Sequence, residues 1–439
     1  MRTHFRGEQL ADPAVKECEK NLRACVHCGI CTATCPTYVL LGDERDSPRG
    51  RIVMMQKMLE EGGAPSAETV THLDRCLSCL GCRTACPSGV DYARLIDKSR
   101  AHIEQHYRRS FGERQLRWGI ATVLTRPHLT RLALWLSRLI SPFAGLLPGP
   151  FRTMVQKGAE IPVRGEGGGN FRHSKRTIKF QTGRRIALLA GCVQQVVAPE
   201  IDQAIARLLA RRGIELVALE AAGCCGALAH HLGREAEAKA WARKMIEAFE
   251  HAGSAEVFEG ILISATGCAS HIRELECLFA DEADWQLRAK AFTASLMPLE
   301  AVVGDSVGKQ ESGLRVALHV PCSQQHGLRW QDCGTLLQQA GFKVLQIQEG
   351  HLCCGSAGSY SILQPAIASA LRERKLSNIH SVHPDVIVTS NIGCLEHLRG
   401  PDAPPIVHFA ELLDWAEGGP EPEALRNRVQ LMTRGEPVN

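Results

Sequence analysis

Short apolar runs alternate with helical segments through the second half of the chain. The runs RRIALLAGC (184–192) and LRVALHVPC (314–322) are short, contain β-branched residues and end at glycine or proline, which is typical of buried strands. After the first run comes PEIDQAIARLLARRG (199–213), a helix-period segment with proline in its first turn and glycine just past its end. Further strands are predicted in pairs at IELVALE and FKVLQIQ, and at GILISATGC and DVIVTSNIGC. Alternating strands and helices predict a parallel sheet covered by helices.

This pattern occurs twice, as an internal repeat. The offset is 130 residues from Cys192 to Cys322, 129 from Cys225 to Cys354 and 126 from Cys268 to Cys394. Three landmarks at nearly constant offset indicate duplication. In each repeat the cysteines follow the carboxyl ends of predicted strands, where open α/β sheets bind ligands. We therefore expect three strand ends of each repeat to bring their thiols to one place.

The first hundred residues lack strand alternation. VMMQKMLEEGG (53–63) and THLDRCLSCLGCRTACP (71–87) predict helices and turns, so a small all-α domain is expected there. A helical segment follows and ends in the glycine-rich, basic run GEGGGNFRHSKRT, which is typical of a flexible linker. The fold class is an α+β multidomain protein, in which an all-α domain precedes two duplicated α/β domains. The predicted division is 1–100, 101–183 for the helical insert and linker, 184–310 and 311–439.

Composition narrows the class of protein. With 44% hydrophobic and 22% charged residues the chain has an ordinary globular composition, which excludes a disordered, collagenous or multi-span membrane protein. The start MRTHFRGEQL has no apolar segment of a secretory signal, so a cytoplasmic location with reduced thiols is expected. Nineteen cysteines in such a chain favour metal ligation over disulfides. The net charge of +4 gives no reason to expect nucleic-acid binding.

Eight of those cysteines form two copies of the motif C-x2-C-x2-C-x3-C-P, one ending at Pro36 and the other at Pro87. The first three thiolates of such a motif wrap one cubane iron-sulfur cluster, and the fourth, turned away by the proline, reaches the other cluster. Zinc sites use pairs of C-x2-C instead. We therefore predict two 4Fe-4S clusters, with cluster A on Cys25, Cys28, Cys31 and Cys86, and cluster B on Cys76, Cys79, Cys82 and Cys35.

The 40 residues from 36 to 75 separate the two motifs too widely for a compact bacterial ferredoxin. This spacing resembles the helical two-cluster domain in the iron-sulfur subunits of respiratory dehydrogenases such as fumarate reductase. Clusters of this kind relay single electrons and do no substrate chemistry. The resemblance implies an electron-transfer role for the N-terminal domain.

The two repeats, with their Cys-Cys-Gly turns at 224–226 and 353–355, resemble the cysteine-rich CCG domain. That domain occurs in subunits of heterodisulfide reductase and of anaerobic glycerol-3-phosphate dehydrogenase, in lactate-utilisation proteins and in glycolate oxidase iron-sulfur subunits. With the DSPRGR stretch (46–51) and the basic insert, the whole layout is similar to the last family.

The resemblance implies an electron-transfer subunit of a flavin-dependent glycolate dehydrogenase, an oxidoreductase that converts glycolate to glyoxylate. FAD would be held by partner subunits, and a quinone or another respiratory acceptor would receive the electrons. The chain has no glycine-rich dinucleotide fingerprint, which agrees with a flavin held elsewhere. Three alternatives stay open: the same role in a lactate or glycerol-3-phosphate system, heterodisulfide-reductase-like catalysis at the CCG sites, and an interaction scaffold.

Each repeat departs from the usual CCG pattern at its end, where C-x2-H replaces C-x2-C. Imidazole replaces thiolate on iron in Rieske centres, so a further cluster or metal in the repeats is one hypothesis. Its ligands would be Cys192, Cys224, Cys225, Cys268 and His271 in the first repeat, and Cys322, Cys353, Cys354, Cys394 and His397 in the second. Relic thiols, or a thiol pair in redox exchange, are the alternatives.

Several other side chains near these motifs have ordinary explanations. His230, His231 and His351 lie beside the Cys-Cys-Gly turns, where a solvated loop histidine is the more common outcome than a contact with a ligand or quinone. Cys277 and Cys333 fall in predicted helices, where a buried small hydrophobic residue is expected.

The insert is basic and amphipathic. Between residues 100 and 140 there are eight arginines against two glutamates. Over residues 115–147 the residues Trp118, Leu132, Trp135 and Leu136 share one side, with arginine on the other. No window of 18 residues there is free of charge, which argues against a transmembrane span. Peripheral contact with the cytoplasmic face of the inner membrane, docking in a partner subunit and packing on the protein's own core are the three interpretations.

Overall fold

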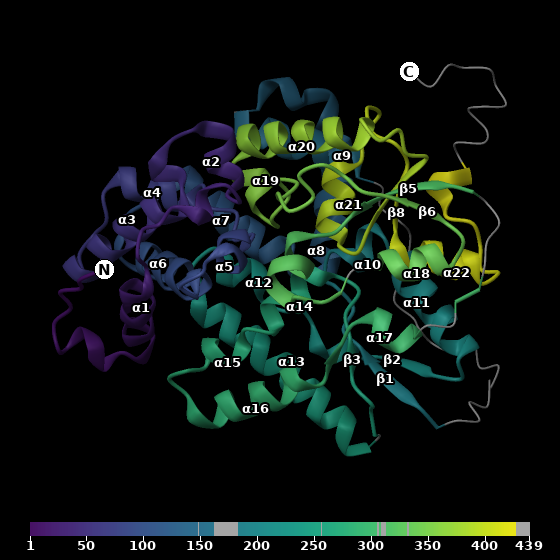
Figure 1. Ribbon diagram of the computed structural model, residues 1–439, viewed down its shortest axis with the longest axis horizontal. Helices are drawn as coiled ribbons and strands as arrows, with labels where there is room; N and C mark the ends of the chain where they lie inside the picture. The colour runs from purple at the N-terminus through teal and green to yellow at the C-terminus, as the bar shows by residue number, and fades with distance from the viewer. Residues whose placement is uncertain are drawn as a thin grey trace.

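The computed structural model describes residues 1–426 apart from 148, 162–182, 256, 305–306, 309–312 and 332. Helices of the first hundred residues form one side of the molecule, and two small sheets with their helices form the other (Figure 1). The glycine-rich run predicted as a flexible linker lies outside the described residues.

Helices and short turns make up the N-terminal part, as the sequence predicts. Their bounds are η1 Gln9–Ala11, α1 Pro13–Ala24, η2 Ile30–Thr32, α2 Pro36–Leu41, η3 Glu44–Asp46, α3 Pro48–Glu61, α4 Ala67–Asp74, α5 Gly81–Ala85 and α6 Tyr92–His106. Proline at the first helical position starts α1, α2 and α3, where its missing N–H costs nothing. The Asp12 and Ser47 side chains cap α1 and α3 by accepting hydrogen bonds from backbone N–H groups. These helices bury a core that includes Leu22, Met55 and Leu95.

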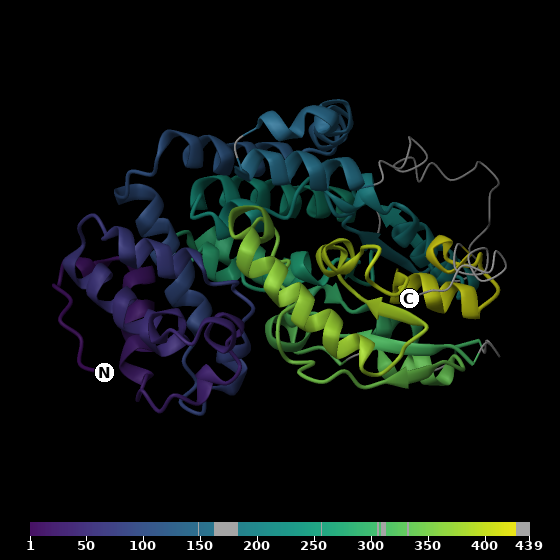
Figure 2. The ribbon, with the colours of Figure 1, turned by 90° about the horizontal axis from the view of Figure 1, so that it is seen from above.

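The basic insert is helical. It comprises α7 Phe111–Val123, α8 Pro127–Ile140, η4 Ser141–Leu146 and α9 Gly149–Glu160. Helices α8 and α9 pack on each other, and α8 also contacts α10 of the first repeat. Seen from above, these blue helices lie over the teal first repeat (Figure 2). Helix α9 also contacts α19 of the second repeat, so the insert packs against both repeats.

The first repeat forms a four-stranded parallel sheet in the order β2-β1-β3-β4. Its strands are β1 Arg185–Leu188, β2 Glu215–Ala218, β3 Ile261–Leu262 and β4 Leu296–Met297. Its helices are α10 Gln194–Val197, α11 Glu200–Arg211, η5 Glu220–Ala222, α12 Ala227–His231, α13 Glu235–Ala255, α14 Thr266–Ile272, α15 Leu275–Leu278, α16 Ala283–Ala294 and α17 Leu299–Val303.

The second repeat forms an equivalent parallel sheet in the order β6-β5-β7-β8. Its strands are β5 Arg315–His319, β6 Lys343–Leu345, β7 Val386–Thr389 and β8 Ile406–His408. Its helices are the π-helical turn η6 Ser323–Leu328, α18 Gly334–Gln339, α19 Tyr360–Leu363, α20 Pro365–His380, α21 Ile392–Leu398 and α22 Phe409–Ala416. The matching strand orders confirm the predicted fold class and duplication. The fourth strand of each sheet was not predicted.

The strand order explains where the thiols gather. In the first sheet the chain passes from β1 to β2 on one side and then to β3 on the other side of β1. The second sheet follows the same path from β5 to β6 and then to β7. The strand order therefore reverses beside β1 and beside β5. In open parallel sheets this switch point, at the carboxyl ends of the strands, is where ligands bind. The cysteine loops follow the three strands that meet there.

The two repeats share a hydrophobic core and are joined at their third strands. The loop after β3 meets the loop after β7, where the N–H of Thr266 donates to the carbonyl of Ser390 at 3.4 Å. The N–H of Gly267 donates to Oδ1 of Asn391 at 3.1 Å. One continuous core holds strands of both sheets together with helices α11 and α22.

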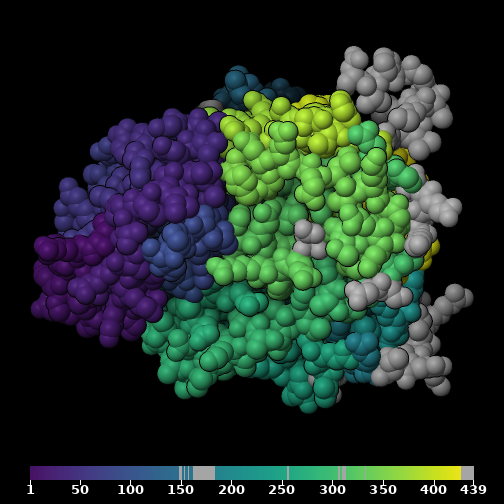
Figure 3. Space-filling model, viewed as in Figure 1, coloured from purple at the N-terminus to yellow at the C-terminus, as the bar shows by residue number. Residues whose placement is uncertain are grey.

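The N-terminal helices pack against both repeats, and Figure 3 shows the purple and blue surface in direct contact with green surface. Arg83 and Arg94 both pair with Glu274 of the first repeat. Tyr360 of the second repeat donates its hydroxyl hydrogen to the carbonyl of Arg75 at 3.0 Å. The cysteine motifs of the N-terminal part therefore lie close to the repeats.

Candidate iron-sulfur centres

Two hollows lined by cysteine lie within the N-terminal helices. The first spans about 430 Å³, a volume that includes space open to solvent. Its cysteines are Cys25, Cys28, Cys31, Cys82 and Cys86. The second spans about 320 Å³, again including space open to solvent, and its cysteines are Cys35, Cys76, Cys79 and Cys82. The structure thus brings the last cysteine of each motif to the first three of the other, as the spacing predicts, while Cys82 lies between the hollows.

The loops between these cysteines have the same backbone geometry in both motifs. In the first motif His27 and Gly29 take left-handed conformations, with φ of 57° and 81°. In the second motif Ser78 and Leu80 do so, with φ of 51° and 60°. Left-handed residues on each side of the middle cysteine curl the loop, and for a leucine this costs about 1–2 kcal/mol. A strained backbone conformation of this kind persists only where the surrounding structure holds it in place.

The donor set fits iron-sulfur clusters. Burial, followed by the neighbouring thiols of Cys25, Cys86 and Cys28, raises the pKa of Cys31 to about 11. Thiols packed together in this way stay protonated unless a cation binds them, and coordination to a metal deprotonates them outright. The N–H of Ser78 points at Sγ of Cys76 and that of Val90 at Sγ of Cys86, each at 3.5 Å. Hydrogen bonds to sulfur are among the factors that set cluster potentials.

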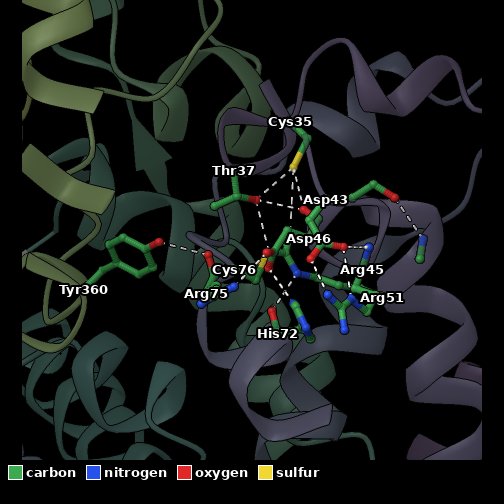
Figure 4. A network of polar contacts seen from close by, with 12 residues as sticks. Cys35, Thr37, Asp43, Arg45, Asp46, Arg51, His72, Arg75, Cys76 and Tyr360 are labelled. Carbon is green, nitrogen blue, oxygen red and sulfur yellow. Dashed lines mark hydrogen bonds and ion pairs between the residues drawn. The ribbon is translucent and has the colours of Figure 1, made fainter. Parts of the chain in front are cut away.

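A buried arginine lies beside the second hollow (Figure 4). Arg51 of α3 is 1% exposed, and its guanidinium donates to Oδ1 of Asp46 at 3.1 Å and to the carbonyl of His72 at 2.8 Å. It also donates to Oγ1 of Thr37 at 3.0 Å and points Nη1 at Sγ of Cys35 at 3.8 Å. Asp46 and Arg51 are the first and last residues of the DSPRGR stretch. This stretch therefore places the positive charge of Arg51 at the edge of the second hollow.

In the first repeat four thiols form one connected group. Sγ of Cys192 lies 3.6 Å from Sγ of Cys224, and Cys225 contacts both Cys224 and Cys268. Hydrogen bonds from Cys192 and Cys225 lower the pKa of Cys224. The structure therefore brings together the four cysteines that the sequence placed at three different strand ends.

The second repeat repeats this arrangement. Sγ of Cys322 lies 3.8 Å from Sγ of Cys353, and Sγ of Cys354 lies 3.5 Å from Sγ of Cys394. Cys353 and Cys354 are in contact through their side chains. This second thiol group is not isolated from the N-terminal part. Cys79 packs in one cluster with Cys322 and Cys353, so the second cysteine-lined hollow lies next to this group.

The histidines at the repeat ends lie on helices beside the thiols. His271 is on α14 with Cys268 and His397 is on α21 with Cys394, each pair three residues apart and so on one helix face. His271 is 5% exposed, and its Nε2 has no hydrogen-bond partner among the described residues. Nε2 of His397 lies 3.2 Å from the carbonyl oxygen of Ala368. The geometry brings each histidine near its thiol group, and ligation remains a prediction.

A further histidine, which no sequence motif marks, lies near the thiols of the second repeat. His319, the last residue of β5, is 2% exposed, and one of its ring nitrogens lies within 4.8 Å of the sulfurs of Cys354 and Cys394. Its Nε2 has no hydrogen-bond partner among the described residues. Burial lowers the pKa of His319 to about 3, so the ring is neutral and carries a free lone pair. The sequence held one signal for this residue, because a histidine is an unusual ionisable residue at the end of an otherwise apolar predicted strand.

The remaining residues singled out from the sequence are placed as follows. Cys333 is buried, as expected, and lies just before α18, whereas Cys277 is exposed on α15, so its predicted burial is wrong. Cys277 sits on a short helix whose two leucines, Leu275 and Leu278, face the core, and helical propensity alone did not fix which side the cysteine takes. His351 is exposed. His230 and His231 are not solvated loop residues, because they end α12 beside Asp97 of α6.

The insert exposes a broad apolar face. Its exposed residues are Phe111, Trp118, Leu132, Trp135, Leu136, Leu139, Ile140, Phe143 and Leu146. Trp118 and Trp135 are 54% and 55% exposed, so the described residues leave the predicted apolar side largely uncovered. The interpretation as packing on the protein's own core is therefore wrong for this side. Among the described helices, none combines the length and apolar character that crossing a bilayer requires.

Two 4Fe-4S motifs on helices, followed by a duplicated α/β unit with four thiols at each sheet edge, define the class of iron-sulfur electron-transfer proteins with CCG domains. The family described as "4Fe-4S dicluster domain" matches residues 21–90, and the family described as "Cysteine-rich domain" matches residues 186–273 and 316–399.

Curated relatives narrow the class. The chain is 37% identical over 428 residues to the glycolate oxidase iron-sulfur subunit of Escherichia coli, covering 95% of this chain and 99% of that protein. It is 28% identical to a probable glycolate oxidase iron-sulfur subunit of Bacillus subtilis over 87% of this chain and 89% of the relative. The lactate utilization protein A of Anoxybacillus flavithermus is 28% identical, but over 52% of this chain only. The chain belongs to the family of glycolate oxidase iron-sulfur subunits.

Proposed function

We propose that this chain is the electron-transfer subunit of a flavin-dependent complex that oxidises glycolate to glyoxylate. The observation that carries this proposal is the pair of four-cysteine hollows, joined in one chain to two CCG thiol groups over the full length of the family's pattern. The flavin and the glycolate site belong to partner subunits in this proposal. Quinone, or another respiratory acceptor, takes the electrons.

The ligand assignment is part of the proposal. Cluster A takes Cys25, Cys28, Cys31 and Cys86, and cluster B takes Cys76, Cys79, Cys82 and Cys35. The support is that each hollow holds its four assigned cysteines, with the additional contact of Cys82 to the first hollow. The domain division at 100, 183 and 310 is kept as well, since the matched family ranges fall inside it.

A third centre in the CCG repeats remains part of the proposal. The four connected thiols of each repeat support it, with His271, His397 and the additional His319 near the sulfurs. Iron analysis of anaerobically purified chain tests it, because two 4Fe-4S clusters account for about eight irons per chain. A content of about eight would leave the repeats without iron, and a larger content would support a further cluster.

The test of the function follows the clusters while substrates are added. The tagged chain is purified anaerobically with its partners, and glycolate, D-lactate and glycerol-3-phosphate are added in turn while the visible absorbance is recorded. Bleaching by glycolate, together with co-purified flavin, is the expected result. Bleaching by D-lactate alone would move the chain to a lactate system. Intact clusters and bound flavoprotein without bleaching by any substrate would contradict the electron-relay role and favour catalysis at the CCG thiols.

The exposed face of the insert serves, in this proposal, as a peripheral contact with an anionic membrane surface at the cytoplasmic side. Its support is the juxtaposition of exposed aromatic and leucine side chains with an excess of arginine, which suits an interfacial helix. Co-sedimentation of the complex with phosphatidylglycerol vesicles tests it, and the double variant Trp118→Ser/Trp135→Ser should lose most of the bound fraction. If that variant instead loses its flavoprotein subunits and keeps vesicle binding, the face is a subunit interface.

A further inference from the structure

A cluster of ionisable side chains lies at the junction between the N-terminal helices and the first repeat. Asp97 of α6 faces His230 and His231 at the end of α12. The Nδ1 atoms of the two rings each lie 4.0 Å from an oxygen of the Asp97 carboxylate. One nitrogen from each ring and one carboxylate oxygen all lie within 4.8 Å of one another. None of these residues belongs to the cysteine motifs described above.

Several polar atoms of this cluster lack a hydrogen-bond partner. Oδ1 of Asp97 and Nδ1 of His231 are buried atoms without a partner among the described residues, and so is Nε2 of the neighbouring His271. The ring of His271 lies 5.1 Å from that of His230 between centroids. Each unsatisfied buried polar atom costs about 1–3 kcal/mol, so several at one place call for a ligand or ion.

The backbone holds the two helices in this position. Gly233, directly after α12, has φ of 81°, and an added Cβ there would overlap the carbonyl of Arg100 on α6. Asp97 precedes Arg100 by one helical turn and so points from α6 toward the same place. The close approach therefore fixes the carboxylate against the imidazoles rather than leaving them on mobile surface chains.

The charge states of the cluster suit a cation. A neutral imidazole such as that of His230 or His231 offers a ring-nitrogen lone pair to a metal ion, and the Asp97 carboxylate offers an oxygen. The nearby arginines are engaged elsewhere: Arg94 pairs with Glu274, and Arg100 donates to Oγ of Ser78 and the carbonyl of Cys76, both at 2.6 Å. No described cation makes a short ion pair with the Asp97 carboxylate.

We propose that Asp97, His230 and His231 bind one divalent transition-metal ion of the zinc class. Three donors within 4.8 Å of one another share a point no more than about 2.8 Å from each, because the centre of an equilateral triangle lies at its side divided by √3. Zinc binds imidazole nitrogen at about 2.0–2.1 Å and carboxylate oxygen at about 2.0–2.2 Å, so inward shifts below about 1 Å complete the site. Two imidazoles and one carboxylate are a donor set that such ions take.

The ion ties the cluster-bearing helices to the first repeat, because Asp97 comes from one and the histidines from the other. Its entry path is the His231 side, since that side chain is 38% exposed while its Nδ1 is buried. His271 flanks the site, on the side toward Cys224. The site is separate from the thiol groups, and its presence does not depend on which substrate the complex oxidises.

The test measures zinc on the intact complex. Anaerobically purified complex is incubated with a small excess of Zn²⁺, desalted and analysed for zinc and iron, and zinc X-ray absorption gives the ligand distances. We expect about one zinc per chain with nitrogen and oxygen neighbours at about 2.0–2.1 Å and no sulfur at about 2.3 Å. The variant His230→Gln/His231→Gln should lose at least about 90% of that zinc, with iron unchanged.

The matched control removes a second histidine pair, His102 and His106 of α6, whose stacked ring centroids lie 4.1 Å apart. The variant His102→Gln/His106→Gln should keep its zinc. Three results would overturn the proposal: no zinc retained by the wild type, zinc with sulfur neighbours, or zinc lost in the control and kept in the site variant. Loss of iron would reveal a site variant that fails to fold, and the wild-type spectrum would then still test the donor set, because sulfur neighbours would overturn the proposal.

Discussion

Arg51 combines nearly complete burial with a full positive charge. Its ion pair with Asp46, which is fully buried, is completed by hydrogen bonds to Thr37 and His72 and by a second arginine, since Arg75 donates to Oδ2 of Asp46 at 2.9 Å. Removing one partner of a buried pair leaves the other charge unsatisfied, which costs about 3–5 kcal/mol. The arginine therefore stabilises the fold around the second cysteine-lined hollow and also sets the electrostatic surroundings of that hollow.

We predict that Arg51→Met lowers the free energy of unfolding by about 3–5 kcal/mol and lowers the reduction potential of cluster B, since a positive charge favours the reduced cluster. Thermal unfolding and potentiometric EPR titration measure the two effects. Arg49→Met is the matched control, because the Arg49–Glu44 pair is exposed and such pairs contribute about 0–1 kcal/mol. Equal effects of the two substitutions would contradict this role of Arg51.

Asp202 of α11 leads to a prediction about how the stability of the protein depends on pH. Burial raises its pKa to about 7, although Ser264 and Gln194 donate to Oδ1 at 2.7 and 2.8 Å. A raised folded-state pKa means that the folded protein binds the proton more tightly, so this stabilising contribution is lost as pH rises from about 4 to 7. Asparagine keeps the accepting oxygen and does not titrate.

Asp202→Asn should therefore gain stability over the wild type as the pH rises from about 5 to about 8, by on the order of 2 kcal/mol. Anaerobic urea unfolding at both pH values measures the difference. The exposed Asp284→Asn is the control and should track the wild type. A constant gap between Asp202→Asn and the wild type across this range would show that Asp202 does not titrate as described.

Sequence spacing predicted which cysteines of the N-terminal motifs gather, because the spacing alone determines which thiols reach one cluster. It did not reveal His319, whose importance comes from the neighbouring strand ends, nor the contact of His230 and His231 with Asp97, more than 130 positions earlier. It also misjudged Cys277, because a short helix can present a cysteine to solvent as readily as to the core. Groups of cysteines that are set by short sequence spacings were therefore predictable, whereas contacts between segments far apart in the chain were not.

At the scale of elements, the strands that lead into cysteine loops were predictable from their apolar runs. β4 and β8 were not, since they have two and three residues and carry no alternation of their own. They are strands because β3 and β7 offer an edge to pair with, which is a tertiary effect. The C-x2-H endings were recognised, but only the structure shows that each lies on a helix whose one face presents both side chains.

Helices α11 and α22 join the repeats through charge as well as through apolar packing. Asp414 of α22 is 1% exposed and accepts from Nε of Arg207 and Nη1 of Arg211, both at 2.8 Å. Replacing Asp414 by asparagine leaves two arginines facing a neutral group. We expect a loss of about 3 kcal/mol and faster hydrogen exchange in α22.

Hydrogen exchange and thermal unfolding of Asp414→Asn test this interface. Asp402→Asn is its control, since Asp402 pairs with Arg372 while 55% exposed and should change stability by less than about 1 kcal/mol. Unchanged exchange in α22 would mean that the shared apolar core alone holds the two repeats together.

At the scale of the molecule, the N-terminal part meets the two repeats differently. It meets the first through Glu274 and the Asp97 cluster, and the second through Cys79, Tyr360 and the contact of His326 with Thr84 at 2.8 Å. The duplicated units are alike in topology and unlike in surroundings. The second cysteine-lined hollow lies next to the second thiol group, so a cluster held there would have a short electron-transfer path into the second repeat.

Resting on the proposed function, we predict that Cys79→Ser removes cluster B, lowers the iron content by about four per chain and stops electron delivery to the acceptor. Glycolate should still reduce the flavin of the partner subunit. Stopped-flow absorbance resolves the flavin from the clusters, and Cys277→Ser, at an exposed thiol outside the motifs, is the control. Loss of flavin reduction as well would show that the cluster domain is required for assembly of the complex.

The contact between Cys79 and the second repeat also bears on how the protein is made. All four cysteines assigned to cluster B lie between residues 35 and 82, whereas Cys322 and Tyr360, which pack around that hollow, follow hundreds of residues later. A ribosome releases the ligands long before the segment that closes over them. The order of synthesis thus makes the four assigned ligands available on the nascent chain before the C-terminal repeat that packs beside them exists.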